Sequence, residues 1–341
     1  MKIVELKYKQ FTFPLKNQLN NSKQTIQSKD AIILKAIDSS GENYFGEVPP
    51  LYGFSKETIL DCKDVLDNFI QDKILLKNVS EIKTDLLPKI KLPSLLFGLE
   101  SILFQMENKQ IFQFIKSRII KNNALIGIDN DANNLEKIQH FIKSGFNTIK
   151  LKVGSDFDKE LNLIKFIKQR FASSIKLRLD ANGSWNYDDA LKNIHNLEKY
   201  NIQYIEQPVN DKNELIELAK KIQMNLAPDE SIKNIKDAEE YINLGNFNFI
   251  VLKPSIRMGV YETIKIIELA NENNINVIIT SAYETVVGKA MLLYLASLTN
   301  HNFAHGLNTE TLGVEIFDSS INYNLPKINL DQDLFTYQIN D

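Results

Sequence analysis

The feature that most constrains the fold is an alternation of short apolar runs with amphipathic helical stretches, which begins near residue 121. The runs recur about every 23 to 28 residues, the length that a strand, a helix and their two connections require. Eight strand candidates match a closed parallel barrel, with a doubly wound open sheet as the alternative. The candidates are residues 124–129, 148–153, 175–180, 202–207, 225–230, 249–254, 276–281 and 302–307.

The residues before this repeat follow a different pattern. Residues 2–8 and 31–37 alternate as strands do, and the polar stretch from Lys16 to Lys29 between them is typical of a mobile surface loop. From about residue 57 to 117 the apolar period becomes helical, with one helix expected over 93–104. We therefore predict an α+β domain over residues 1–120, a catalytic barrel over 121–313 and a C-terminal segment, 314–341, that returns to the first domain.

The composition excludes several classes of partner. The formal net charge is only −3, so we expect no nucleic-acid surface. No apolar stretch approaches the ~18 residues of a membrane span, and the N-terminus lacks the apolar core of a signal peptide. We expect a cytoplasmic protein without a membrane partner. The single cysteine, Cys62, excludes an intrachain disulfide, and its helical context predicts a buried packing role. The expected partner is a small molecule.

Charged residues collect at the carboxyl ends of five consecutive strand candidates. In a β/α barrel these ends surround the active site. Taken alone, an acid at such a position could cap the next helix and a lysine could simply be solvated. Their occurrence on five successive strands favours an active site instead. The residues, in chain order, are Lys150, Lys152, Asp180, Glu206, Asp229 and Lys253.

The three acids predict a metal site. Carboxylates directed into one barrel mouth repel one another strongly unless a cation lies among them. Oxygen ligands without histidine or cysteine favour a hard cation. We therefore expect Asp180, Glu206 and Asp229 to bind Mg²⁺, with Mn²⁺ as a possible substitute.

The lysines indicate proton transfer at a carbon next to a carboxylate. Removing that proton leaves an enediolate, whose charge the metal would stabilise. The base must be a neutral lysine, and the nearby charge of Lys150 is expected to lower the pKa of Lys152. Lys253, on the opposite side, could act as a second acid or base or as a fixed cation. Lys152 and Lys253 are thus the predicted catalytic residues, with Lys150 beside the substrate.

These residues resemble the enolase superfamily, in its muconate-lactonizing-enzyme-like branch. The matching motifs are KLK at 150–152, DAN at 180–182, EQP at 206–208, DES at 229–231 and Lys253. The resemblance implies an α/β fold of the modified TIM-barrel, (β/α)7β type, an α+β N-terminal capping domain, and a lysine base that works with Mg²⁺.

Within that branch, several segments are similar to the o-succinylbenzoate synthase family of menaquinone biosynthesis. They are GEVPPLYGFSKET (46–58), PSLLFGLES (93–101), KPS (253–255), TSAYETVVG (280–288) and HGLNT (305–309). Three residues depart from the family pattern. Thr280 and Ala282 stand where some members have serine, and Asn308 stands where GLDT has aspartate. The departures concern substrate contacts rather than the metal.

The resemblance implies a lyase reaction, the dehydration of 2-succinyl-6-hydroxy-2,4-cyclohexadiene-1-carboxylate to 2-succinylbenzoate. Lys152 would remove the proton next to the ring carboxylate and return it to the departing hydroxyl, while Lys253 faces the other side of the ring as a cation. Arg178, one of four arginines, is expected to bind a carboxylate, with a buried ion pair as its alternative. Thr280 and Ser281, with N–H groups near Gly288, are candidates for the succinyl carboxylate.

Other functions stay open at this stage. An N-acylamino-acid racemase, a dipeptide epimerase or a cycloisomerase of the same branch would use the same metal and lysines. A barrel without catalytic activity could be a small-molecule binding protein, but it would be expected to lack at least one of these residues. A Schiff-base aldolase would need a lysine but not three acids. The histidines lie away from the predicted ligand positions and are assigned surface or packing roles; they are His140, His195, His301 and His305.

Overall fold

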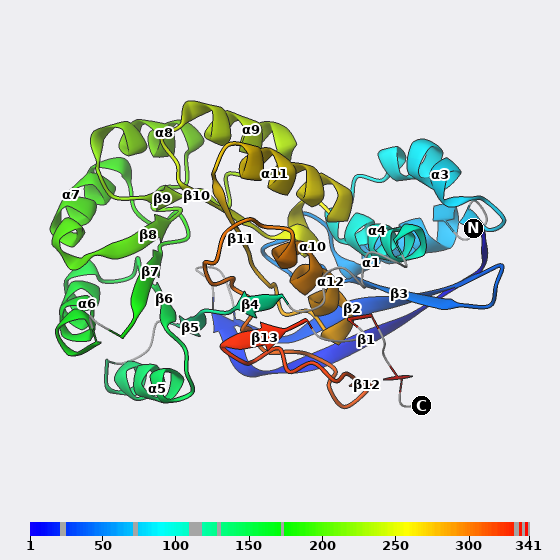
Figure 1. Cartoon of the computed structure of the whole chain (residues 1–341), viewed down its shortest axis with the longest axis horizontal. Coiled ribbons are helices and arrows are strands. Elements are labelled where there is room, and N and C mark those ends of the chain that lie inside the picture. The colour runs from blue at the N-terminus through cyan, green and yellow to red at the C-terminus, as the bar shows by residue number, and fades with distance from the viewer. Residues whose placement is uncertain are drawn as a thin grey trace.

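A β/α barrel lies beside an N-terminal antiparallel sheet and its helices in the computed structural model (Figure 1). The described residues are 1–20, 25–70, 74–108, 118–127, 131–171, 174–330, 334–335 and 338–339. In this part of the chain, no helix combines the length and apolar content needed to cross a membrane.

The N-terminal sheet is built from three antiparallel strands in the order β1-β2-β3: β1 (Ile3–Asn20), β2 (Thr25–Asp38) and β3 (Asn43–Val48). The predicted loop from Lys16 to Lys29 is wrong over most of its length, because β1 continues to Asn20 and β2 resumes at Thr25. Leu19 pairs with Ile26, beyond an irregularity after Pro14. Residues 21–24, where that prediction also falls, lie outside the described residues.

Helices cover one side of this sheet. The predicted helix over 93–104 is confirmed as α4, which extends to Glu107, and Cys62 is fully buried in α1 as expected. Two glycines let α4 approach β3, since a Cβ on Gly46 would lie 2.0 Å from the Gly98 carbonyl oxygen. The helical segments are α1 (Ile59–Val65), a π-helical turn (Leu66–Ile70), α3 (Val79–Glu81), a second π-helical turn (Ile82–Leu86), a 3₁₀ turn (Leu87–Lys89) and α4 (Pro93–Glu107).

The barrel strands form a closed parallel ring, which excludes the open sheet. A hydrogen bond from Val251 N–H to the Pro228 carbonyl (2.9 Å) joins β9 to β10. Thr280 then pairs with Gly306, and His305 pairs with Asn122 just before β5. The eighth candidate, 302–307, therefore closes the ring through two bridged residues rather than a full strand. The strands are β5 (Ala124–Ile126), β6 (Thr148–Lys152), β7 (Lys176–Asp180), β8 (Ile202–Glu206), β9 (Leu226–Ala227), β10 (Phe249–Leu252) and β11 (Asn276–Ile279).

Helices follow the strands around the outside of the ring (Figure 1). Polar side chains cap several of their N-termini, as Asp211 does by accepting from the N–H groups of Asn213 and Glu214. His140 and His195 lie in α5 and α7, as expected from the sequence. The helices are α5 (Asp131–Lys143), α6 (Phe157–Phe171), α7 (Tyr187–Leu197) with a 3₁₀ turn (Glu198–Tyr200), α8 (Lys212–Lys221), α9 (Ile235–Leu244), α10 (Pro254–Arg257), α11 (Val260–Glu272) and α12 (Val286–Ser297).

The two parts of the chain are joined by buried contacts. Glu100 in α4 accepts hydrogen bonds from the N–H groups of Val260 (2.6 Å) and Tyr261 (3.0 Å), at the start of α11. Near the C-terminus, β13 (Lys327–Asn329) pairs with β4 (Ile119–Lys121), and β12 (Phe317–Asp318) pairs with β14 (Gln338–Ile339). The Phe317 ring packs edge-on against Phe11 of β1. The C-terminal segment thus contacts both the barrel and the N-terminal sheet.

Candidate active site

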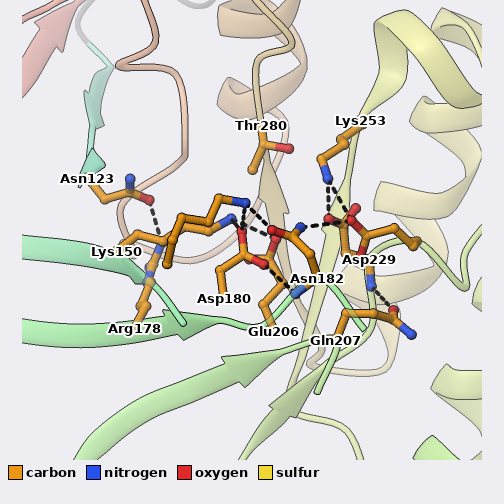
Figure 2. A network of polar contacts seen from close by, with 12 residues as sticks. Asn123, Lys150, Arg178, Asp180, Asn182, Glu206, Gln207, Asp229, Lys253 and Thr280 are labelled. Atoms are coloured by element: carbon orange, nitrogen blue, oxygen red, sulfur yellow. Dashed lines mark hydrogen bonds and ion pairs between the residues drawn. The ribbon is translucent and has the colours of Figure 1, made fainter. Parts of the chain in front are cut away.

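Three carboxylates meet at the carboxyl ends of neighbouring barrel strands. Figure 2 shows Asp180, Glu206 and Asp229 side by side, with Lys150 approaching from one side and Lys253 from the other. Strand register produces this arrangement, because Lys152 pairs with Asp180 and Asp180 pairs with Glu206 across adjacent strands. The three carboxylate residues are at most 2% exposed. The sequence-predicted acids are therefore brought together in a buried site.

Lysine ammonium groups lie directly against these carboxylates. Lys150 Nζ is 2.8 Å from Asp180 Oδ2 and 2.6 Å from Glu206 Oε1. Lys152 Nζ lies 2.7 Å from the same Asp180 oxygen, so the two lysines share one partner. Lys253 forms an ion pair with Asp229 on the other side. Lys152 has the most exposed side chain of the three lysines, at 28% compared with 8% and 12% for Lys150 and Lys253.

The pKa values of the three acids are shifted in different directions. Burial by itself would raise the pKa of Asp180, but Lys150 and Lys152 bring it below its usual range. Burial would likewise raise the pKa of Asp229, but the charges of Lys253 and Lys150 together lower it. Burial and the neighbouring charge of Asp180 raise the pKa of Glu206 well above its usual range. Glu206 is thus the acid whose negative charge the lysines compensate least.

The donor set fits a divalent cation, although the carboxylates are not arranged around one. Among the described residues, no three acidic, histidine or cysteine side chains are drawn together closely enough to hold a metal ion. The Glu206 Oε2 atom is buried and has no hydrogen-bond partner in this part of the chain. All-carboxylate oxygen donors suit Mg²⁺. Metal binding by Asp180, Glu206 and Asp229 stays a prediction. A cation bound there would require the lysine ammonium groups to turn away from these oxygens.

We expect Glu206→Gln to weaken Mg²⁺ binding by more than the ~10–100-fold typical of changes to residues that only support metal ligands. The substitution removes a buried negative charge and one oxygen donor while keeping the side-chain volume. Titration calorimetry with Mg²⁺ measures the affinity directly. Glu217→Gln is the matched control, because the Glu217 side chain is 55% exposed on α8 and pairs with Lys220. Equal affinities for the wild type and Glu206→Gln would contradict the metal assignment.

Arg178 lies below the carboxylates rather than at the open end of the barrel. It is fully buried, and its guanidinium donates to Gln203 Oε1 (2.7 Å), Asn123 Oδ1 (3.1 Å) and the Ala304 carbonyl (2.7 Å). It also stacks over the Tyr204 ring at 4.9 Å. All three acceptors are neutral, so these hydrogen bonds do not form the buried ion pair that was the alternative expectation for Arg178. The geometry favours a structural role within the barrel over a direct substrate contact.

The predicted contacts for a succinyl carboxylate are already engaged by protein. Thr280 Oγ1 donates to the Leu252 carbonyl (3.2 Å), and Ser281 Oγ bonds to Glu284 and Thr309. The Gly288 N–H, expected near that carboxylate, donates instead to Glu47 Oε2 (2.8 Å). Thr280 and Ser281 do lie at the carboxyl end of β11, so a role beside the substrate stays a prediction for both.

Sequence reasoning missed the polar residues that support the site. Asn182 accepts from Lys152 and donates to Glu230 Oε1 (3.0 Å). Gln207 Oε1 accepts from the N–H groups of Asp229 (2.9 Å) and Ser231 (3.2 Å), which fixes the backbone after β9. Asn182 and Gln207 both have positive φ, at 46° and 38°, a strained conformation that clusters at functional sites. Their position beside a predicted ligand, in DAN and EQP, was the available signal.

A family model described as Enolase C-terminal domain-like matches residues 134–328, more than half of the chain. The L-Ala-D/L-Glu epimerase of Francisella tularensis subsp. novicida (strain U112) is 27% identical, covering 98% of each chain. The o-succinylbenzoate synthase of Bacillus subtilis (strain 168) is 29% identical, covering 83% of this chain and 79% of that protein.

A solved structure supports the same fold. The dipeptide epimerase from Enterococcus faecalis V583, complexed with Mg and the dipeptide L-Leu-L-Tyr, superposes with a TM-score of 0.88 at 24% identity, covering 96% of this chain and 97% of that one. The modified TIM-barrel prediction is therefore confirmed. The matched stretch also includes the strands that carry all six charged residues of the site. The chain is an enzyme of the enolase superfamily and belongs to its muconate-lactonizing-enzyme-like branch.

Proposed function

We propose that this enzyme is an o-succinylbenzoate synthase, which dehydrates 2-succinyl-6-hydroxy-2,4-cyclohexadiene-1-carboxylate to 2-succinylbenzoate in menaquinone biosynthesis. The synthase is favoured by an apolar contact between the N-terminal domain and the segments that follow β10 and β11. Leu51, Ile256 and Ala282 are buried together, with Phe54 packed against them. Phe54 remains partly exposed beside this buried cluster, and its apolar ring suits a carbocyclic substrate better than a zwitterionic dipeptide.

The acidic residues beyond the strand ends support the same choice. A dipeptide carries an ammonium group, which needs a carboxylate partner when it is buried. Glu230 is bonded by Asn182 and Lys253, and Glu284 accepts from Ser255 and Ser281. Glu310 accepts from the N–H of Lys16 (3.0 Å). Each of these carboxylates already has a protein donor, although Glu230 Oε2 is buried without one among the described residues, and the proposed substrate brings no cation to be neutralised.

The chain's own lysines account for the reaction. Lys152 Nζ takes the proton from the ring carbon that bears the carboxylate, and the electron pair left there forms the enediolate. Collapse of the enediolate breaks the ring carbon–hydroxyl bond, and the Lys152 ammonium returns its proton so that water leaves. Lys253 holds a positive charge on the opposite face of the ring. When bound, a divalent cation at Asp180, Glu206 and Asp229 stabilises negative charge on the substrate carboxylate.

Dipeptide epimerisation is the second candidate function. It is favoured by the two lysines on opposite sides of the carboxylates, because epimerisation needs an acid or base on each face of the reacting carbon. Curated relatives also include dipeptide epimerases at similar identity, among them the Hydrophobic dipeptide epimerase of Enterococcus faecalis (strain ATCC 700802 / V583), 27% identical over 92% of this chain.

The two candidates are separated by their products. We expect the Mg²⁺-loaded protein to form 2-succinylbenzoate, followed by ultraviolet absorbance, with Lys152→Ala as the matched background. A parallel incubation of L,L-dipeptides in D₂O, analysed by NMR, measures exchange at the α-carbon. Rapid deuterium incorporation into dipeptides without any aromatic product would replace the synthase with an epimerase. Activity with both substrates would retain the synthase and add a second reaction.

A further inference from the structure

Four charged side chains form a buried cluster away from the carboxylates of the active site, here called the interdomain cluster. Two come from the N-terminal sheet and two from the barrel, and each is at most 2% exposed. Two positive and two negative charges leave the cluster neutral, which is the condition under which buried charges are tolerated. Its members are Lys29 of β2, Glu47 of β3, Glu284 after β11 and Lys289 of α12.

Glu47 crosses from the N-terminal sheet to the first turn of α12. Its carboxylate accepts from the Thr285 N–H (3.0 Å), the Thr285 hydroxyl (2.6 Å) and the Gly288 N–H (2.8 Å). The N–H groups at the start of a helix have no acceptor within the helix itself, and negative charge is favoured there. A Cβ on Gly288 would lie 2.6 Å from Glu47 Oε2, so glycine allows this approach. The N-terminal domain thereby fixes the beginning of α12.

Glu284 ties together the segments that follow two catalytic strands. It accepts from the hydroxyls of Ser255 and Ser281 and from the Ala282 N–H (2.8 Å). Ser255 lies two residues beyond Lys253, and Ser281 follows the end of β11. Lys29 adds a bond from the N-terminal sheet, because its ammonium donates to the Ala282 carbonyl. The backbone at 281–285 is thus held both by contacts within the barrel and by a contact from the N-terminal sheet.

Lys289 extends the cluster to the last part of the barrel. Its ammonium donates to the carbonyls of Leu307 (3.1 Å) and Thr309 (2.6 Å) and to the Thr311 hydroxyl (3.0 Å). Burial lowers the pKa of Lys289 to about 7, while the charges of Glu284 and Glu47 act in the opposite direction. Lys289 lies in the first turns of α12, the helix whose beginning Glu47 fixes, so the segment 307–311 is linked to Glu47 through this helix.

We propose that Glu47 is a positioning residue, which sets the segments 281–285 and 307–311 for the part of the substrate distant from the reacting carbon. This inference rests on the proposed function, because it requires the substrate to bind at the mouth of the barrel, where both segments follow strand ends. In the part of the chain that the structure describes, the hydrogen bonds of the interdomain cluster reach none of the six charged residues of the active site. Glu47 therefore acts on substrate affinity and leaves the proton-transfer groups in place.

Glu47→Gln tests this role by removing one negative charge at constant volume, which leaves two buried lysines opposite a single glutamate. We expect KM to rise about tenfold, close to the lower limit for losing a hydrogen bond to a charged group, while kcat changes less than about threefold. Glu47→Asp retains the charge and should give a KM closer to that of the wild type. Mg²⁺ affinity, measured by calorimetry, should not change in either variant.

Asp38→Asn is the matched control. Asp38 is also a buried carboxylate that accepts backbone N–H groups, from Ser40 (2.8 Å) and Glu42 (3.1 Å), but it is the last residue of β2, at the opposite end of β3 from Glu47. Its loss should lower thermal stability and leave KM as in the wild type. If Glu47→Gln does not fold, Thr285→Ala removes one donor to Glu47 without unbalancing the charges, and a smaller rise in KM is expected.

The kinetics are measured with whichever substrate the wild type converts. A wild type that makes no 2-succinylbenzoate but epimerises dipeptides contradicts the proposed function, while the test of Glu47 continues on the dipeptide. An unchanged KM in the folded variant, or a loss confined to kcat, would overturn the positioning role. An equal rise in KM for Asp38→Asn would overturn it as well, because the effect would then reflect general destabilisation.

Discussion

Lys152→Ala should reduce turnover by about 10³- to 10⁴-fold, the upper part of the range for loss of a general acid or base. The substitution removes the proposed base and also the group that returns the proton to the leaving hydroxyl. Lys152 is the most exposed lysine of the site and shares the Asp180 oxygen with Lys150, so it stands nearest to solvent and substrate. Both steps of the proposed dehydration should therefore fail together.

Substrate and Mg²⁺ should still bind to the Lys152→Ala protein, which calorimetry with Mg²⁺ and with the product can measure. Lys159→Ala is a suitable control, because the Lys159 side chain is 79% exposed on α6, where it pairs with Asp156. Its rate should match the wild type. A small primary amine added to the assay should restore part of the Lys152→Ala rate by taking the place of the missing side chain. Full activity in Lys152→Ala would remove this residue from the role of base.

The main features of the site could be predicted from the sequence because they follow from the regular geometry of strands. Side chains alternate along each strand and parallel neighbours pair in register, so charges at equivalent positions meet. Lys152, Asp180 and Glu206 pair in this way in β6, β7 and β8. A period of about one βα unit repeated eight times likewise predicted a closed ring. These inferences needed only local pattern and repetition.

Contacts between distant segments could not be predicted in the same way. Lys29 lies in a polar stretch that is typical of an exposed loop, yet it is 2% exposed because Glu47 and Glu284 balance its charge. Neither partner is near it in sequence. Backbone N–H groups near Gly288 were expected to bind the succinyl carboxylate, but the N-terminal domain supplies the acceptor for the Gly288 N–H. Such pairings depend on how two domains dock, which no periodicity in either domain reveals.

Lys253 provides the second large effect and separates the two candidate reactions. Lys253→Ala should be severely impaired in either case, since it removes the positive charge that faces the substrate from the side opposite Lys152. Lys253→Arg is more informative. Arginine keeps the positive charge but cannot be deprotonated near neutral pH, so it can replace a fixed cation and cannot replace a base. For a synthase, we expect Lys253→Arg to retain a measurable rate of 2-succinylbenzoate formation, well above that of Lys253→Ala.

An epimerase predicts the opposite pattern, because each direction of the reaction uses one lysine as base and the other as acid. Lys253→Arg would then be as inactive as Lys253→Ala in racemisation, while Lys152 could still exchange the α-proton on its own face with solvent. Rates of product formation and of deuterium exchange, measured for both variants, distinguish these outcomes. The buried environment makes the test stringent, since Asp229 and Glu230 hold the pKa of Lys253 above its usual range despite burial. Arginine at this position keeps the positive charge, so a surviving rate in Lys253→Arg would identify the cation role.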